Sequence, residues 1–138
     1  MAIIVDASVA LKWVIQEPDS AAAIQLVLDE ALAAPEFLFV ECANVLWTKV
    51  RRGVLSASAA RVALAEIEAT PIRTTSTRAQ AAAAHVIAVE LGQSAYDSLY
   101  LATAIAERST LVTADAKFTA AALAHPVYQN SVRLLGAS

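Results

Sequence analysis

The chain has 138 residues, of which 58% are hydrophobic, and its formal net charge is −3 at pH 7. This length suits one domain, 1–138, and the apolar content predicts a substantial core, which excludes a disordered chain. The longest stretch without Asp, Glu, Lys or Arg, 118–132, is broken by polar residues and excludes a membrane span. No basic residues precede the apolar amino end and Cys42 is the only cysteine, so we expect a cytoplasmic protein.

Short β-rich runs alternate with longer helical segments along the chain. The first half predicts a buried strand at 2–5, a helix at 7–16, a helix at 20–33, an extended piece leading into a helix within 37–53, and a helix at 56–69. Ser56 or Ser58 would be the N-cap of the last of these helices. The second half predicts a strand at 71–75, helices at 77–92 and 95–106, a strand at 110–115, a helix at 116–124 and a strand at 132–135. Strands separated by helices indicate an α/β fold with a parallel sheet covered on both faces.

Four of the thirteen acidic residues lack an obvious solvated position. Asp6 and Asp115 each stand at the carboxyl end of a predicted strand, Glu41 follows the apolar run "FLFV", and Asp97 lies in a helix that is apolar on all sides. The carboxyl ends of parallel strands meet at one edge of a sheet, so these acids can converge there. Converging carboxylates would take up protons unless a cation lay among them. Oxygen ligands without nearby His or Cys favour Mg²⁺ or Mn²⁺ over zinc.

A structural role is also available to most of these acids individually. Asp6 and Asp115 each precede a predicted helix and would serve as N-caps, and Asp97 near a helix start is favoured by the helix dipole. Glu41 has no such role. The joint occurrence of all four favours a site over four separate structural roles.

Four motifs in order, "VDAS", "ECANVLW", "AYDSLYLATA" and "LVTADAKF", resemble those of the PIN-domain family. They are most similar to its VapC-type toxin ribonucleases of type II toxin–antitoxin systems, and the match extends from Ile3 to Leu134. The resemblance implies a three-layer α/β fold, a Mg²⁺- or Mn²⁺-dependent endoribonuclease, a VapB-type antitoxin as partner, and a homodimer. A surplus of apolar residues also favours the homodimer.

The resemblance also assigns roles to individual residues. Asp6, Glu41, Asp97 and Asp115 fall on the acidic cluster of the family, and we expect Asp6 and Asp97 to be the direct metal ligands. Glu41 would bind metal or position and deprotonate the water, and Asp115 would act directly or through water. The polar residues that match supporting positions of the family are Ser8, Thr113 and Asn44.

RNA contacts are harder to place, because the chain has no strongly basic segment. The group "KVRR" supplies Lys49, Arg51 and Arg52, and Lys117 is a further candidate, although a solvated helix end explains the group equally well. A weakly charged frame favours a structured RNA, such as tRNA or rRNA, recognised by shape. We expect His85 and His125 to be packing or surface residues, and Tyr96 and Tyr100 to be core residues rather than base-stacking ones.

Two other functions are compatible with these residues. One is a catalytically silent PIN-like module that binds RNA or a protein partner, which the intact acids disfavour. A Mg²⁺-dependent phosphatase or phosphoacceptor domain also places Asp at strand ends, but "DAS" lacks the second acid that a haloacid-dehalogenase-type enzyme requires.

Overall fold

The structure is a computed structural model that describes residues 2–137. Within these residues, five parallel strands form one sheet in the order β3-β2-β1-β4-β5. The strands are β1 (Ile3–Val5), β2 (Leu32–Pro35), β3 (Ile72–Thr75), β4 (Leu111–Thr113) and β5 (Val132–Leu134). The helices are α1 (Ala7–Ala10), the 3₁₀ turn η1 (Leu11–Trp13), α2 (Ser20–Asp29), α3 (Phe37–Arg51), α4 (Ala57–Ala69), α5 (Thr77–Leu91), α6 (Ala95–Ala106) and α7 (Ala116–Leu123).

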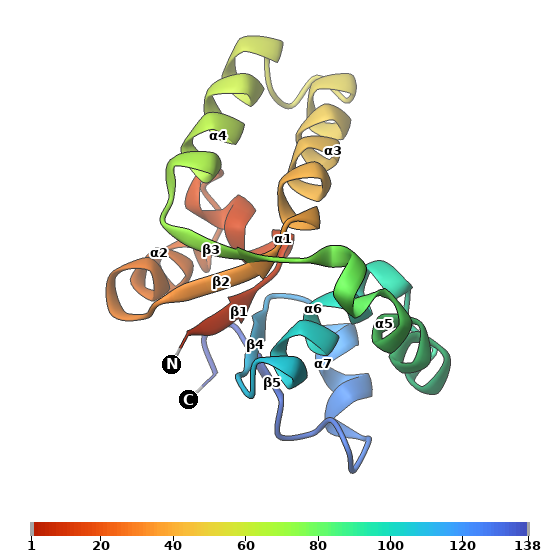
Figure 1. The fold of residues 1–138 in the computed structure, drawn as a ribbon. Coiled ribbons are helices and arrows are strands. Elements are labelled where there is room, and N and C mark those ends of the chain that lie inside the picture. The colour runs from red at the N-terminus through yellow and green to blue at the C-terminus, as the bar shows by residue number, and fades with distance from the viewer. Residues whose placement is uncertain (1, 138) are drawn as a thin grey trace.

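The helices form a layer on each face of the sheet (Figure 1). From β1 the chain moves outward through β2 to β3, with α1 to α3 on one side of the sheet and α4 packed beside α3. It then crosses back to β4 and β5, with α6 and α7 on the other side and α5 packed beside α6. Right-handed crossovers require this change of face when the direction of travel reverses. The predicted three-layer α/β fold is therefore confirmed.

The core is built around the central strands and α6. Every residue of β2 and β4 is buried, and so are all seven residues from Ser98 to Ala104, on every side of α6. Tyr100 and Phe118 are the largest fully buried side chains. Burying an apolar side chain of this size contributes roughly 1.5–3 kcal/mol. The prediction that 95–106 is a buried helix is thus correct for its middle, while its first turn is exposed.

The sequence prediction was wrong at β2. The helix predicted at 20–33 ends at Asp29, and Leu32 begins a strand. The extended piece predicted at the start of 37–53 is helical, because α3 already begins at Phe37. Leu-Ala-Ala favours a helix locally, but β2 is hydrogen-bonded to β1 and β3 on its two sides, and this pairing overrides local propensity. The helix predicted at 7–16 is also shorter, because α1 passes into η1, which ends at Trp13.

Ser56, and not Ser58, is the N-cap of α4, since its side-chain oxygen accepts the Ala59 amide at 3.1 Å. We therefore expect Ser56→Ala to lower the free energy of unfolding by about 1 kcal/mol, whereas Ser58→Ala changes it little. Urea unfolding of the two variants measures the difference. Equal losses for both would contradict the assignment of the cap.

None of the helices within residues 2–137 is long and apolar enough to span a membrane.

Candidate active site

The site lies where the direction of the sheet reverses. Strands β1 and β4 are neighbours, but the chain leaves β1 towards β2 and leaves β4 towards β5. At such a switch point the segments after the two strands diverge and leave a crevice at their carboxyl ends. Asp6 directly follows β1, and Asp115 lies two residues beyond the end of β4. The fold therefore brings together acids that are far apart in the sequence.

All four predicted acids line one pocket at this point. The pocket has a volume of about 180 Å³ and is lined by Asp6, Glu41, Asp97 and Asp115, together with Ala7, Ser8, Leu11 and Val45. Glu41 comes from the second turn of α3, and Asp97 from the first turn of α6. The two helix layers and two strand ends each contribute a carboxylate.

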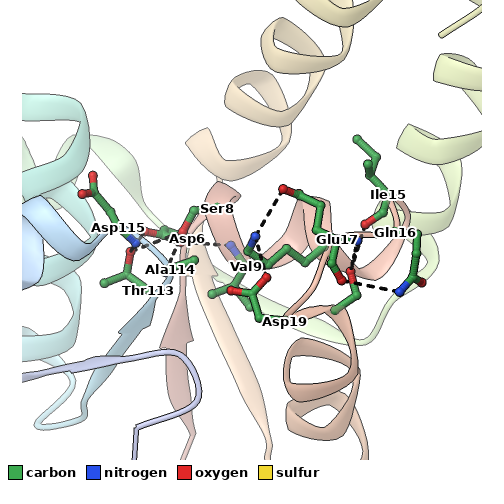
Figure 2. Close-up of polar contacts among 12 residues, drawn as sticks. Asp6, Ser8, Val9, Ile15, Gln16, Glu17, Asp19, Thr113, Ala114 and Asp115 are labelled. Atoms are coloured by element: carbon green, nitrogen blue, oxygen red, sulfur yellow. Dashed lines mark hydrogen bonds and ion pairs between the residues drawn. The ribbon is translucent and has the colours of Figure 1, made fainter. Parts of the chain in front are cut away.

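Two hydroxyl groups hold the carboxylate of Asp6 (Figure 2). Ser8 Oγ donates to Oδ1 at 2.5 Å and Thr113 Oγ1 donates to Oδ2 at 2.5 Å. The same two hydroxyls also accept backbone amides from the segment that follows β4. Ser8 accepts the Ala114 N–H at 2.9 Å, and Thr113 accepts the Asp115 N–H at 3.1 Å. Ser8 and Thr113 thus orient Asp6 and fasten the segment after β1 to the segment after β4.

Asp6 and Asp115 are also helix caps. The Val9 amide donates to Asp6 Oδ1 at 3.2 Å at the start of α1, and the Phe118 amide donates to Asp115 Oδ1 at 2.9 Å at the start of α7. The structural alternative raised by the sequence is therefore correct, and it coexists with the pocket. One carboxylate can cap a helix and still present free lone pairs to a ligand.

Glu41 is held by a residue that the sequence assigned only to the core. Tyr100 is 1% exposed, as expected of a core residue, but its hydroxyl donates to Glu41 Oε1 at 2.5 Å. No short motif links the two residues, which are 59 positions apart. The only signal in the sequence was a tyrosine, rather than phenylalanine, one helical turn after Asp97, since a buried tyrosine hydroxyl usually has a partner.

Burial raises the pKa values of three of the four carboxylates, and their mutual repulsion adds to the rise. Burial raises the pKa of Asp6 to about 6, although hydrogen bonds from Ser8, Thr113 and Val9 lower it, and the charge of Asp97 adds to the rise. Burial likewise raises the pKa of Glu41, against the Tyr100 hydrogen bond and with the charges of Asp6 and Asp97. Burial also raises the pKa of Asp97, opposed by Ser94 and reinforced by Asp115.

The donor set suits a hard divalent cation. Within residues 2–137, none of the four carboxylates forms an ion pair with a Lys, Arg or His side chain. Uncompensated carboxylate oxygens are the ligands that Mg²⁺ and Mn²⁺ prefer. In the part of the chain that the structure describes, however, no three His, Cys, Asp or Glu side chains are grouped closely enough to hold one ion. The pocket thus contains suitable oxygen donors, but among residues 2–137 they do not form a complete coordination site.

The other predicted site residues lie outside this pocket. Asn44 is exposed on α3, and Lys49, Arg51 and Arg52 lie at the far end of that helix, where the Arg51 guanidinium lies 5.4 Å from the Trp47 ring centroid. Lys117 is exposed in the first turn of α7, two residues after Asp115, and is the nearest of the four cations to the pocket in sequence.

Cys42 and three residues that we expected to be structural also lie outside the pocket, and the expectation for one of the three was wrong. His85 is exposed, and the His125 ring packs against the Tyr128 ring at a tilt of 31°, with centroids 4.6 Å apart. Burial raises the pKa of the Cys42 thiol to about 12, helped by Glu41 and Asp6, which keeps it protonated. Tyr96 was wrongly expected in the core: it is 66% exposed and stacks on Phe37 at 5.4 Å, because the first turn of α6 projects beyond the packed layers.

An ion-pair cluster follows α1 and fixes the segment next to the pocket (Figure 2). The side chain of Lys12 is 11% exposed and lies 2.8 Å from Asp19 and 3.5 Å from Glu17. Because Ser8 and Leu11 line the pocket from this segment, the pairing restrains one of its walls. Solvent screens ion pairs at such exposed carboxylates, so the pairing orders the segment more than it stabilises the fold.

Comparisons with known proteins agree with this architecture. The sequence model described as "PIN domain" matches residues 3–123. No curated protein sequence gives a significant match. Similar solved structures include PAE2754 from Pyrobaculum aerophilum, with 24% identity and a TM-score of 0.69, covering 88% of this chain and 79% of that one.

Two further similar structures are those of VapC20 and VapBC2. VapC20 from Mycobacterium tuberculosis, described as a toxin that cleaves the sarcin–ricin loop, has 19% identity and a TM-score of 0.67, covering 87% of this chain and 95% of that one. VapBC2 from Rickettsia felis, bound to a DNA fragment from its promoter, has 15% identity and a TM-score of 0.65, covering 97% and 98%. At these identities the likeness establishes a shared fold.

Proposed function

The chain belongs to the PIN domain family, and from this we propose that it is a Mg²⁺- or Mn²⁺-dependent endoribonuclease whose site is the acidic pocket. One observation carries the proposal: Asp6, Glu41, Asp97 and Asp115 line a single pocket and have no basic side chain paired with them in the described chain. A family fold alone would not specify activity, because related folds serve different functions. The acids supply the chemistry that a phosphodiesterase needs.

We assign different roles in hydrolysis to the residues of the pocket. Asp6 and Asp97 would hold the divalent ion, and Glu41 and Asp115 would complete its ligands or orient the attacking water. When bound, the ion supplies Lewis-acid chemistry, which makes water a better nucleophile and offsets charge on the scissile phosphate. Ser8 and Thr113 keep the Asp6 carboxylate oriented by donating to both of its oxygens. No side chain in this scheme forms a covalent bond to RNA.

We further propose that the chain is the toxin of a toxin–antitoxin pair and is neutralised by a VapB-type antitoxin. The similarity of its fold to VapC20 and to the VapBC2 complex supports this assignment. A structured RNA, such as tRNA or rRNA, is the proposed substrate, with Lys117 and the cations at the end of α3 as candidate phosphate contacts. Large exposed apolar side chains, among them Leu28, Val89 and Val127, favour a homodimer.

The direct test is cleavage of a structured RNA by the purified, partner-free protein. We expect discrete fragments with Mg²⁺ or Mn²⁺ and intact RNA when EDTA removes the metal, resolved on a denaturing gel. Zn²⁺ should support cleavage poorly, because the pocket offers only oxygen donors.

A folded protein that leaves RNA intact with every metal would reject the nuclease. Retained RNA binding in that case would favour the alternative of a catalytically silent binding module. Hydrolysis of a phosphate monoester instead of RNA would favour the phosphatase.

A further inference from the structure

The contact between Tyr100 and Glu41 joins helices from the two layers and involves one acid of the pocket. Tyr100 belongs to α6 on one face of the sheet, and Glu41 belongs to α3 on the other. The tyrosine is buried, and its hydroxyl donates to Glu41 Oε1 at 2.5 Å. Within residues 2–137 this is the only hydrogen bond that the Glu41 carboxylate makes with the protein, so Oε2 has no protein donor.

The chemistry of this donor matters as much as its position. A Lys or Arg at the same place would neutralise Glu41 and compete with a cation for it. A phenol donates one hydrogen bond and brings no positive charge. Ser8 and Thr113 treat Asp6 in the same way, again through neutral hydroxyls. Both carboxylates are thus oriented by donors that bring no positive charge, which is the arrangement that a metal ligand requires.

We propose that Tyr100 is a positioning residue that holds the Glu41 carboxylate so that its second oxygen is available to a divalent cation in the pocket. The inference deepens the proposed function and rests on it. Glu41 has a long, flexible side chain, and ordering it only when the ion arrives would weaken binding. The hydroxyl of Tyr100 orders it beforehand, in a pocket whose donors do not otherwise form a tight group.

The chain contains a matched control for this contact. Tyr128 is also buried, at 6% exposure, and its hydroxyl donates to Glu90 at 2.6 Å. Neither Tyr128 nor Glu90 lines the acidic pocket. Tyr128→Phe therefore removes the same kind of hydrogen bond, from a tyrosine to a glutamate, at a place where no metal is expected.

The experiment measures Mn²⁺ binding to the full, RNA-free chain by isothermal titration calorimetry. We expect Tyr100→Phe to raise the Kd for Mn²⁺ about tenfold, the lower end of what loss of a partner behind a metal ligand causes. Tyr128→Phe should leave the Kd unchanged. If Tyr100 acts through Glu41, then Tyr100→Phe should have no further effect in a Glu41→Gln background.

Several results would overturn the inference. If Tyr100→Phe bound Mn²⁺ as tightly as the wild type, or more tightly, the hydroxyl would not assist metal binding. An equal weakening in the Glu41→Gln background, or loss of cooperative thermal unfolding in Tyr100→Phe, would identify a packing role. A wild type that binds no Mn²⁺ would overturn the inference and the proposed function together. A wild type that binds Mn²⁺ in the predicted pattern but leaves RNA intact would reject only the nuclease.

Discussion

Asp97→Asn is expected to lower the rate of metal-dependent RNA cleavage on the order of 10³-fold, because a ligand that stabilises charge through a divalent ion contributes several kcal/mol to the transition state. The variant should remain folded. Asp97 is half-buried in the first turn of α6, and its amide, which Ser94 Oγ accepts at 3.1 Å, is unaffected by the substitution. A gel-based rate at saturating Mn²⁺, with thermal unfolding of the same samples, measures both effects.

Glu107→Gln is the control for this experiment. Glu107 caps the opposite end of α6 and pairs with Arg73 at 2.8 Å, so the variant removes a carboxylate from the same helix but not from the pocket. Its cleavage rate should equal that of the wild type. If Asp97→Asn cleaved RNA at the wild-type rate, the assignment of the acidic pocket would be wrong.

The metal-free protein is expected to lose stability as the pH rises. The folded pKa of Asp6, about 6, lies above its ordinary value of 3.8, so the folded state holds this proton more tightly than the unfolded chain does. The stabilisation is fully present below the ordinary value and is lost as the pH rises through about 6. For Asp6 the loss amounts to about 3 kcal/mol. Glu41 and Asp97 shift in the same direction and add to it.

Urea unfolding of the wild type and of Asp6→Asn, from below pH 3.8 to neutral pH, isolates the contribution of the Asp6 carboxyl group to the free energy of unfolding. The difference between the two should favour the wild type at low pH and the variant at neutral pH, because Asn keeps the cap and carries no charge. Mn²⁺ at about 100 times its Kd should restore about 2.7 kcal/mol at neutral pH. A pH-independent difference would show that the Asp6 carboxylate is not buried in the metal-free protein as the pocket implies.

The fold was predictable where local patterns and tertiary contacts agree. Helices with clear caps, such as α4 after Ser56 and α5 before Gly92, fall within one or two residues of their predicted limits. Gly92 adopts φ +64°, which explains why a glycine ends that helix. Strand β2 was missed because its identity depends on neighbours on both sides, and Leu-Ala-Ala carries no trace of them.

The acids of the site could be selected from the sequence because a carboxylate in apolar surroundings is conspicuous. Their convergence in one pocket required the order of the strands, which only the structure gives. The partners that hold them were only partly accessible. Ser8 and Thr113 lie within two residues of an acid and so share its motif. Tyr100 and Glu41 belong to different helices, α6 and α3, so their contact can be recognised only in three dimensions.

The adjacency of β1 and β4 also determines when the pocket can exist during synthesis. Asp6 is bonded to Thr113, 107 positions later, and Asp115 follows still further along. A ribosome adds about 5–20 residues per second, so Asp6 leaves it seconds before its partners are made. Until the segment with Thr113 and Asp115 has emerged, the nascent chain has no complete pocket. A protein that cuts RNA would thus remain harmless to the ribosome and messenger that produce it until that segment is free to fold.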